Sequence, residues 1–432
     1  MEFYSTKNKT LRVPFREAVL KGIAMDGGLF MPAEIPVLGK KKIQGLSRMS
    51  FQEISYEVAK HFTGDDLTSG ALQDIVTSAF DFPVVVRSLS DEIAVLELFH
   101  GPTLAFKDFG ARFTSRVMSH FLHGENKEVT VLVATSGDTG SAVASGFFNV
   151  EGIKVVLLYP LGKVSNIQEK QLTTAGGNVT ALEVEGTFDD CQRLVKEAFS
   201  DTALNRQRNL TSANSINFAR LLPQSFYYFY AYSKLAAKNP NIIFSVPSGN
   251  LGNLTAGLIA SEMGLPVKKF IGAVNRNSVL SDYISEGQLR TRPSIRTLSN
   301  AMDVGNPSNM VRIFDLYRDS YEKIKNIIFS SSISDERTKA GIREVYDKYE
   351  YIIDPHGAVG YEAIKDFNSD SVNAVSVILE TAHPAKFPEV IEDALGFSGE
   401  IPQRLLEYLK KEKKAVRISG AYDEFRSFLM QI

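Results

Sequence analysis

A lysine in the first third of the chain stands in a setting that suits covalent chemistry. Lys107 lies in the string HGPTLAFKDFG (100–110), where aromatic and apolar residues flank it. A lysine that forms a Schiff base must be partly desolvated, because only its neutral amine attacks a carbonyl carbon. The flanking residues therefore favour a reactive lysine at this position. The alternative is a solvated surface lysine, which is the commoner role of this residue type.

Two glycine-rich segments could bind an anion. The first, SGNLGN at 248–253, follows an apolar run and precedes a helical pattern, so its backbone N–H groups could converge on a phosphate at the positive end of a helix. No Gly-Lys-Ser/Thr follows it, and its spacing does not fit the dinucleotide fingerprint. The second, SGDTG at 136–140, is a polar turn of the same kind. Either segment could instead be a helix cap or a tight turn without a ligand.

Both loops belong to strand-turn-helix units that recur along the chain. The apolar runs that we predict to be strands lie at 129–133, 155–158, 179–184, 242–246, 270–274, 351–353 and 374–379. This alternation predicts an α/β fold with two open, largely parallel sheets. Since ligands of such sheets bind beyond the carboxyl ends of the strands, the two glycine-rich loops could face one cleft.

The region around Lys107 and the N-terminal segment before it differ from this pattern. Apolar residues at 109, 113, 117 and 121 predict an amphipathic helix that begins next to Lys107 and ends near Gly124. The first ~95 residues show turns and short helical patterns without the strand-turn-helix rhythm. We predict an N-terminal accessory domain at 1–96, a small mobile α/β domain at 127–215, and a large domain formed by 97–126 and 216–432.

Composition excludes several classes of partner. The chain has 48 Lys and Arg against 50 Asp and Glu, so a net charge of -2 gives no electrostatic reason to expect nucleic acid. Cys191 is the single cysteine, and no Cys/His cluster offers the ligands of a structural metal site. No apolar run approaches the roughly 20 residues that span a bilayer, and the first residues do not resemble a signal peptide. We expect a soluble cytoplasmic protein without a metal or a membrane partner.

Six strings in this order resemble the signature blocks of the threonine synthase family, in its long bacterial and fungal form. They are HGPTLAFKDFGARF (100–113), ATSGDTGSA (134–142), VPSGNLGN (246–253), NAMDVGNPSN (300–309), DPHGAVGY (354–361) and TAHPAKFPE (381–389). The opening YSTKN and DGGLFMP (26–32) are also similar to that form, so the resemblance covers nearly the whole chain. One departure is Leu251, where the family pattern has Phe.

The resemblance implies a fold-type-II enzyme that depends on pyridoxal 5'-phosphate, similar to tryptophan synthase β and the serine/threonine dehydratases. Lys107 would carry the cofactor as a Schiff base, within the large domain. Five loop residues would hold the cofactor phosphate, namely Gly249, Asn250, Leu251, Gly252 and Asn253. Thr381 would be the hydroxyl partner of the pyridine nitrogen. Asp138 occupies the position of a polar residue near the ring's 3'-oxygen, where relatives often have Asn, and an acid there would repel an anionic oxygen unless a proton lies between them.

The resemblance also implies a substrate, O-phospho-L-homoserine, which this family converts with water to L-threonine and phosphate in the last step of threonine biosynthesis. Ser136 and Thr139 would hold its carboxylate or phosphate. The second phosphate site would use Ser215, Asn217 and Arg220, with Lys163 as a further candidate. Arginine suits this role because its planar fork donates two parallel bonds to phosphate oxygens. Arg220 precedes Leu-Leu-Pro, however, and could simply cap a helix.

Two other functions are compatible with many of these residues. A related pyridoxal-phosphate enzyme, either a phospho-lyase acting on the same substrate or a serine/threonine dehydratase, would share most of these residues. A dehydratase would not need the second phosphate site. A protein of another class, an α/β protein that binds a nucleotide for regulation, would use the glycine-rich loops without Lys107. Among the remaining residues, His100 could move protons or be structural, and Cys191 falls on a helical pattern that predicts packing.

Overall fold

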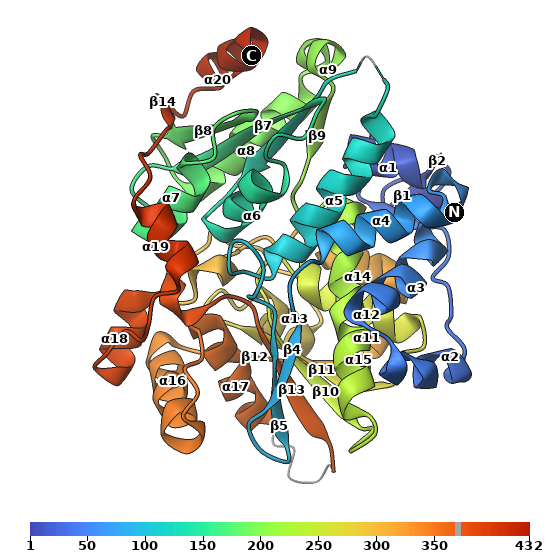
Figure 1. Cartoon of the computed structure of the whole chain (residues 1–432), viewed down its shortest axis with the longest axis vertical. Helices are drawn as coiled ribbons and strands as arrows, with labels where there is room; N and C mark the ends of the chain where they lie inside the picture. Colours follow the sequence, from blue (N-terminus) through green and yellow to red (C-terminus); the bar gives the residue numbers. More distant parts are fainter. Residues whose placement is uncertain (126, 368–372) are drawn as a thin grey trace.

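The computed structural model describes residues 1–125, 127–367 and 373–432. Its larger sheet, in the lower half of Figure 1, has six strands in the order β12-β11-β10-β13-β5-β4. Their bounds are β4 (Val85–Ser88), β5 (Ile93–Glu97), β10 (Ile242–Pro247), β11 (Val267–Val274), β12 (Ile328–Ser332) and β13 (Val375–Glu380). All neighbours run parallel except β4 and β5, which pair antiparallel.

Helices cover both faces of this sheet. Ile242 and Phe244 of β10 pack into one hydrophobic cluster, and Ile243 packs into another, because successive side chains of a strand point to opposite faces. The first face lies against α12 (Gly252–Glu262) and α11 (Pro223–Leu235), and the second lies against α17 (Pro355–Phe367) and α16 (Asp335–Tyr349). The strands are therefore apolar on both sides, as is typical of parallel sheets.

The smaller sheet lies in the upper half of Figure 1 and has five parallel strands in the order β14-β8-β7-β6-β9. Their bounds are β6 (Val129–Ala134), β7 (Ile153–Pro160), β8 (Val179–Val184), β9 (Leu210–Ser212) and β14 (Val416–Ile418). The helices around it are α5 (Lys107–Leu122), α6 (Asp138–Gly146), α7 (Asn166–Thr173), α8 (Phe188–Ser200), α9 (Thr202–Arg208) and α20 (Tyr422–Gln431). Leu132, Leu158, Cys191 and Phe425 form part of the core between this sheet, α8 and α20.

The N-terminal region is a three-stranded antiparallel sheet followed by helices. Its elements are β1 (Glu2–Ser5), β2 (Arg12–Pro14), α1 (Phe15–Lys21), β3 (Phe30–Pro32), α2 (Lys40–Gly45), η1 (Leu46–Arg48), α3 (Phe51–Thr63), η2 (Gly64–Asp66) and α4 (Ser69–Ala79). Helix α3 packs on α11, and α4 packs on α5. Ser50 begins α3 with a capping box, in which its hydroxyl and the side chain of Glu53 each satisfy the other's backbone N–H group.

The last part of the chain returns from the larger sheet to the smaller one, as the orange and red ribbon of Figure 1 shows. It passes from β13 through η5 (Pro384–Lys386), α18 (Pro388–Leu395) and α19 (Gln403–Leu409), which packs on α7, and then adds β14 to the edge of the smaller sheet beside β8. The remaining elements are α10 (Phe218–Leu221), α13 (Val279–Glu286), η3 (Asn300–Met302), α14 (Met310–Tyr317) and α15 (Tyr321–Ile327).

The predicted α/β fold with two largely parallel sheets and an N-terminal region of different character is confirmed. The helix expected next to Lys107 begins at Lys107 itself and ends at Leu122. The strand predicted at 351–353 is wrong, since these residues form no strand. The N–H of Asp354 donates to Glu380 Oε1 at 2.6 Å, and β13 already has β10 and β5 as its two neighbours, so no sheet edge is free there.

The three small N-terminal strands were not predicted, because strands of three or four residues are too short to show a periodicity. The predicted division into three domains remains a prediction, and two strand pairings join residues that it assigns to different domains. β4 and nearly all of β5 lie within the predicted accessory domain at 1–96, yet both strands belong to the six-stranded sheet. β14 lies in the range of the predicted large domain, yet it pairs with β8 of the smaller sheet.

Candidate active site

Lys107 is fixed at the start of α5 by backbone pairing with a segment far away in sequence. Phe106 N donates to Thr381 O at 2.8 Å, and His383 N donates to Leu104 O at 3.0 Å. Burial lowers the pKa of Lys107 to about 8, an effect that the nearby Asp138 carboxylate opposes and that Lys386 adds to. The amine is therefore neutral far more often than that of a surface lysine, which suits a nucleophile.

The loop at 248–253 connects β10 to α12 and has the geometry of an anion cradle. Leu251 adopts a left-handed conformation with φ 60° directly before α12, where the N–H groups of the first helical turn have no intrahelical partner. A side chain at Gly249 would bring Cβ to 2.7 Å from the Cα atom of Met302, so only glycine fits there. Asn250 anchors the loop, because its Oδ1 accepts from Ser308 N at 2.5 Å.

The loop at 136–140 connects β6 to α6 and is organised by a side chain. Thr135 Oγ1 accepts from the N–H groups of Gly137, at 3.0 Å, and Gly140, at 2.9 Å. Gly137 has φ 143°, a conformation that other residues rarely adopt. The next residue, Asp138, is buried at the start of α6, and its Oδ1 accepts from Gln168 Nε2 at 3.1 Å and lies 2.5 Å from Lys386 Nζ.

Arg220 is buried beside α5, where the absence of a side chain at Gly110 gives it room. Its Nη1 donates to Ala213 O, and in the described part of the chain no carboxylate lies within ion-pair distance of its guanidinium. Burial lowers its pKa to about 10, and the more distant charge of Asp108 opposes this effect only in part. A buried guanidinium without an acidic partner is costly unless an anion binds there, so this residue is a candidate anion ligand.

One cavity brings most of the predicted site residues together. Its walls include Lys107, Ser136, Thr139, Ser215, Arg220, Gly249, Asn250, Leu251, Gly252, Asn253 and Thr381. Asp138 lies behind the wall, on Lys386. Asn217 is buried elsewhere, where its Oδ1 caps α10 by accepting from Ala219 N at 3.0 Å and its Nδ2 donates to Val19 O at 2.9 Å. Lys163 is exposed and is not among the lining residues of this cavity.

Other residues of the cavity were not assigned a role from the sequence. His356 lines it, accepts from Ala301 N through Nε2 at 3.2 Å, and contacts Asp354 Oδ1 through Nδ1 at 2.8 Å, so it holds the η3 segment over the site. Asn214 and Gln224 also line the cavity. The string DPHGAVGY pointed to His356, whereas no local signal marks Gln224, which lies within an apolar helix.

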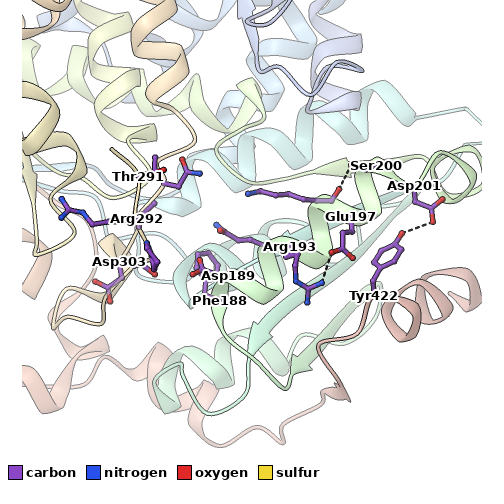
Figure 2. A pocket seen from close by; sticks show the side chains of 17 residues that line it. Phe188, Asp189, Arg193, Glu197, Ser200, Asp201, Thr291, Arg292, Asp303 and Tyr422 are labelled. Atoms are coloured by element: carbon purple, nitrogen blue, oxygen red, sulfur yellow. Dashed lines mark hydrogen bonds and ion pairs between the residues drawn. The ribbon is translucent and has the colours of Figure 1, made fainter. Parts of the chain in front are cut away.

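A second, wider cleft continues outward from this cavity. It has a volume of about 890 Å³, and it shares Phe188, Gln192, Asp303 and Val304 with the inner cavity. Figure 2 shows Arg193 and Glu197 of α8 on one side and Thr291 and Arg292 on the other. The cleft therefore lies between the smaller sheet and a loop that follows α13, and it opens the inner cavity toward solvent.

The fold and this cavity define a pyridoxal-phosphate-dependent enzyme. The family model described as "Pyridoxal-phosphate dependent enzyme" matches residues 81–379, which hold Lys107, both glycine-rich loops and Arg220. Models described as "Threonine synthase N terminus" and "Threonine synthase, C-terminal" match residues 2–80 and 357–429.

Known relatives narrow this class to one family. The chain is 41% identical over 431 residues to a threonine synthase of Serratia marcescens, covering 100% of this chain and 99% of the relative. It superposes on the crystal structure of Escherichia coli threonine synthase with a TM-score of 0.94 at 40% identity, with full coverage of both chains. A pyridoxal-phosphate-bound threonine synthase from Brucella melitensis gives a TM-score of 0.93 at 33% identity, with coverage of 100% and 99%. The chain belongs to the threonine synthase family.

The cofactor of this enzyme class fits the residues of the cavity. Asn253 Nδ2 and Asn214 Oδ1 are buried in the wall and have no hydrogen-bond partner among the described residues, so both are free for a ligand. The cradle at 248–253 suits a phosphate and Lys107 suits an aldehyde. Among the described residues, no group of three His, Cys, Asp or Glu side chains could hold a metal ion. No helix in the same part of the chain is long and apolar enough to span a bilayer.

Proposed function

We propose that this chain converts O-phospho-L-homoserine and water to L-threonine and phosphate, and that Lys107 carries the cofactor. The observation that carries the proposal is that one cavity contains a reactive lysine, a backbone cradle for one phosphate, and a buried guanidinium that can bind a second anion. A dehydratase would not need a buried guanidinium such as that of Arg220, because its substrate carries no phosphate. The membership in the threonine synthase family supports the same activity.

The cradle and Thr381 hold the cofactor in this proposal. The N–H groups of Gly249 to Asn253 and the free amide of Asn253 bind its phosphate at the N-terminus of α12. The hydroxyl of Thr381 would be the neutral partner of the pyridine nitrogen. Asp138, which is paired with Lys386 behind the cavity wall, would act on the ring through its charge. When bound, pyridoxal phosphate supplies the electron sink that stabilises negative charge at the substrate's α-carbon.

Lys107 is the acid and base of the reaction. With the cofactor bound, the amine of Lys107 would take a proton from Cα of the substrate and then from Cβ. Because burial holds the pKa of Lys107 at about 8, the amine accepts and returns protons close to neutral pH. Loss of the Cβ proton lets phosphate leave from Cγ, water then adds at Cβ, and protons return to Cα and to the terminal carbon.

Arg220 and Ser215 bind the phosphate of the substrate, and Ser136 and Thr139 bind its carboxylate. The Oγ atom of Ser215 is held by Asn250 Nδ2 and Asn309 Nδ2, each at 3.1 Å, so the second phosphate site touches the first through Asn250. Asn217 supports this site indirectly by capping α10, and Lys163 does not bind the substrate in this proposal.

We assign the reaction to the cytoplasm because Cys191, the single cysteine, is buried and free.

Isotope labelling tests this proposal. In water enriched in heavy oxygen, L-threonine should gain one heavy oxygen atom while the released phosphate initially carries none, because the C–O bond breaks during elimination. In heavy water, deuterium should enter Cα and the terminal carbon. Homoserine with labelled phosphate would indicate a phosphatase, and a keto acid with ammonia would indicate a phospho-lyase. Either of these results would contradict the proposal.

A further inference from the structure

Lys386 is a completely buried lysine that the proposed reaction does not use. It ends η5, and its side chain has no exposed surface. Its Nζ lies 2.5 Å from Asp138 Oδ1 and donates to Thr103 O at 3.1 Å. A buried ammonium group is stable only with a close counter-charge and further acceptors, so Asp138 is its necessary partner.

The ion pair joins two parts of the molecule beside Lys107. Asp138 begins α6, next to the smaller sheet, whereas Lys386 follows the segment 381–383 that pairs with residues 104–106. Thr103 O also accepts from Gln171 Nε2 of α7 at 3.1 Å, so it ties the same two parts together a second time. Backbone pairing thus fixes Lys386 relative to Lys107, and Lys386 in turn fixes Asp138.

The charges around this pair show what it compensates. Burial alone would raise the pKa of Asp138, but the charges of Lys386 and then Lys107 hold that pKa well below its usual range. Asp138, Lys386 and Arg220 are the charged groups that face Lys107. Asp108 is the other carboxylate near Lys386, and it is occupied by the N–H and hydroxyl of Thr103 at 2.8 and 2.7 Å.

We propose that Lys386 is a positioning residue for Lys107, because it holds Asp138 beside the Lys107 amine and neutralises the charge of that carboxylate inside the buried site. This inference rests on the proposed placement of the cofactor. The pair acts as a unit: without Lys386, the negative charge of Asp138 acts unopposed on the Lys107 nitrogen and on the ring. Without Asp138, the charge of Lys386 acts unopposed.

The test is a pH titration of the near-visible absorption band of the holoenzyme. Lys386→Met removes a positive charge and so favours the protonated form of the Lys107 nitrogen, which should raise the midpoint by about one pH unit. Asp138→Asn removes the opposing negative charge and should lower the midpoint by a similar amount. The double variant, in which both charges are absent, should titrate within a few tenths of a unit of the wild type, as should Lys386→Arg.

Matched measurements separate this role from a merely structural one. Lys339→Met, which removes a surface lysine paired with Asp393 at 3.0 Å, should leave the midpoint unchanged. If Lys386→Met does not fold, Asp138→Asn and the double variant decide the question, because the second charge removal should reverse the shift caused by the first. Equal midpoints in Asp138→Asn and the double variant would overturn the proposal, as would a wild-type midpoint in Lys386→Met. A near-visible band that persists in Lys107→Ala would instead refute the cofactor placement.

Discussion

The two glycine-rich loops of the site have the same connectivity but differ in charge. Each joins a parallel strand to the N-terminus of a helix, β10 to α12 and β6 to α6. The loop at 248–253 contains no charged side chain, and its affinity for an anion comes from backbone N–H groups and the helix dipole. The loop at 136–140 places a carboxylate at the start of its helix and compensates it with Lys386 from another segment.

A strand-loop-helix unit therefore does not by itself define what it binds. In the uncharged loop, ligand binding depends on the conformation of the backbone, so substitutions that alter the shape of the loop should weaken binding most. In the charged loop, the site depends on the balance of charges, so substitutions that add or remove a charge should have the largest effect. The following experiments test this contrast and the site that the two loops share.

The largest effect is expected from the lysine between the two loops. Lys107→Ala should abolish the near-visible absorption band and lower kcat by at least about 10³-fold, because it removes both the attachment point and the base. Absorbance spectra and a phosphate-release assay measure these effects, with Lys339→Ala as a surface control. An active variant that keeps the band would show that the loops do not serve a lysine at this position.

The second phosphate site should respond to loss of the buried guanidinium. Arg220→Leu should raise KM for O-phospho-L-homoserine about 10- to 100-fold, since a charge-assisted bond to phosphate contributes roughly 1.5 to 3 kcal/mol. The dissociation constant of pyridoxal phosphate should change little, because the cradle at 248–253 is separate. Arg48→Leu, at an exposed position, is the matched control. Parallel losses of cofactor and substrate affinity would show that Arg220 is structural.

The uncharged loop should be sensitive to a single methyl group. Gly249→Ala should weaken binding of pyridoxal phosphate by about 10-fold, because the new Cβ meets the backbone of Met302 at 2.7 Å and must displace the loop or η3. Fluorescence titration of the apoenzyme measures the affinity. Gly45→Ala, where a Cβ would meet nothing within 4 Å, should leave it unchanged. An unaltered affinity in Gly249→Ala would mean that the shape of the loop is not decisive.

The smallest effect is expected at the pyridine nitrogen. Thr381→Asp should favour a protonated ring and strengthen its electron-withdrawing character, which should lower threonine formation a few-fold and increase side products. The ratio of threonine to keto acid, measured by chromatography, reports the change, and Thr381→Ser should retain the wild-type ratio. If Thr381→Asp also retained it, Thr381 would not be the partner of the ring nitrogen.

Features that depend on local sequence were predictable. The helix at Lys107, the strands β6 and β10 and the two loops after them are each encoded by neighbouring residues, and all lie where the sequence places them. Lys386 could not be assigned a role, because its charge has meaning only beside Asp138, which is distant in the chain. Asn217 was predicted from the resemblance to belong to the second phosphate site, yet its contacts with Val19 and Ala219 make it a cap rather than part of the cavity wall.

The long return path of the chain has a consequence for biosynthesis of the protein itself. β5 is synthesised early, but its neighbour β13 is synthesised only after nearly all the other strands. The neighbour of β8, β14, is the last strand to be synthesised. Until then, β5, β10 and β8 each lack one neighbouring strand, and such unpaired edges are templates for aggregation. Native pairing between such distant segments is also slow to form, because a long loop must close first. A newly made chain therefore depends on its last segments to complete both sheets.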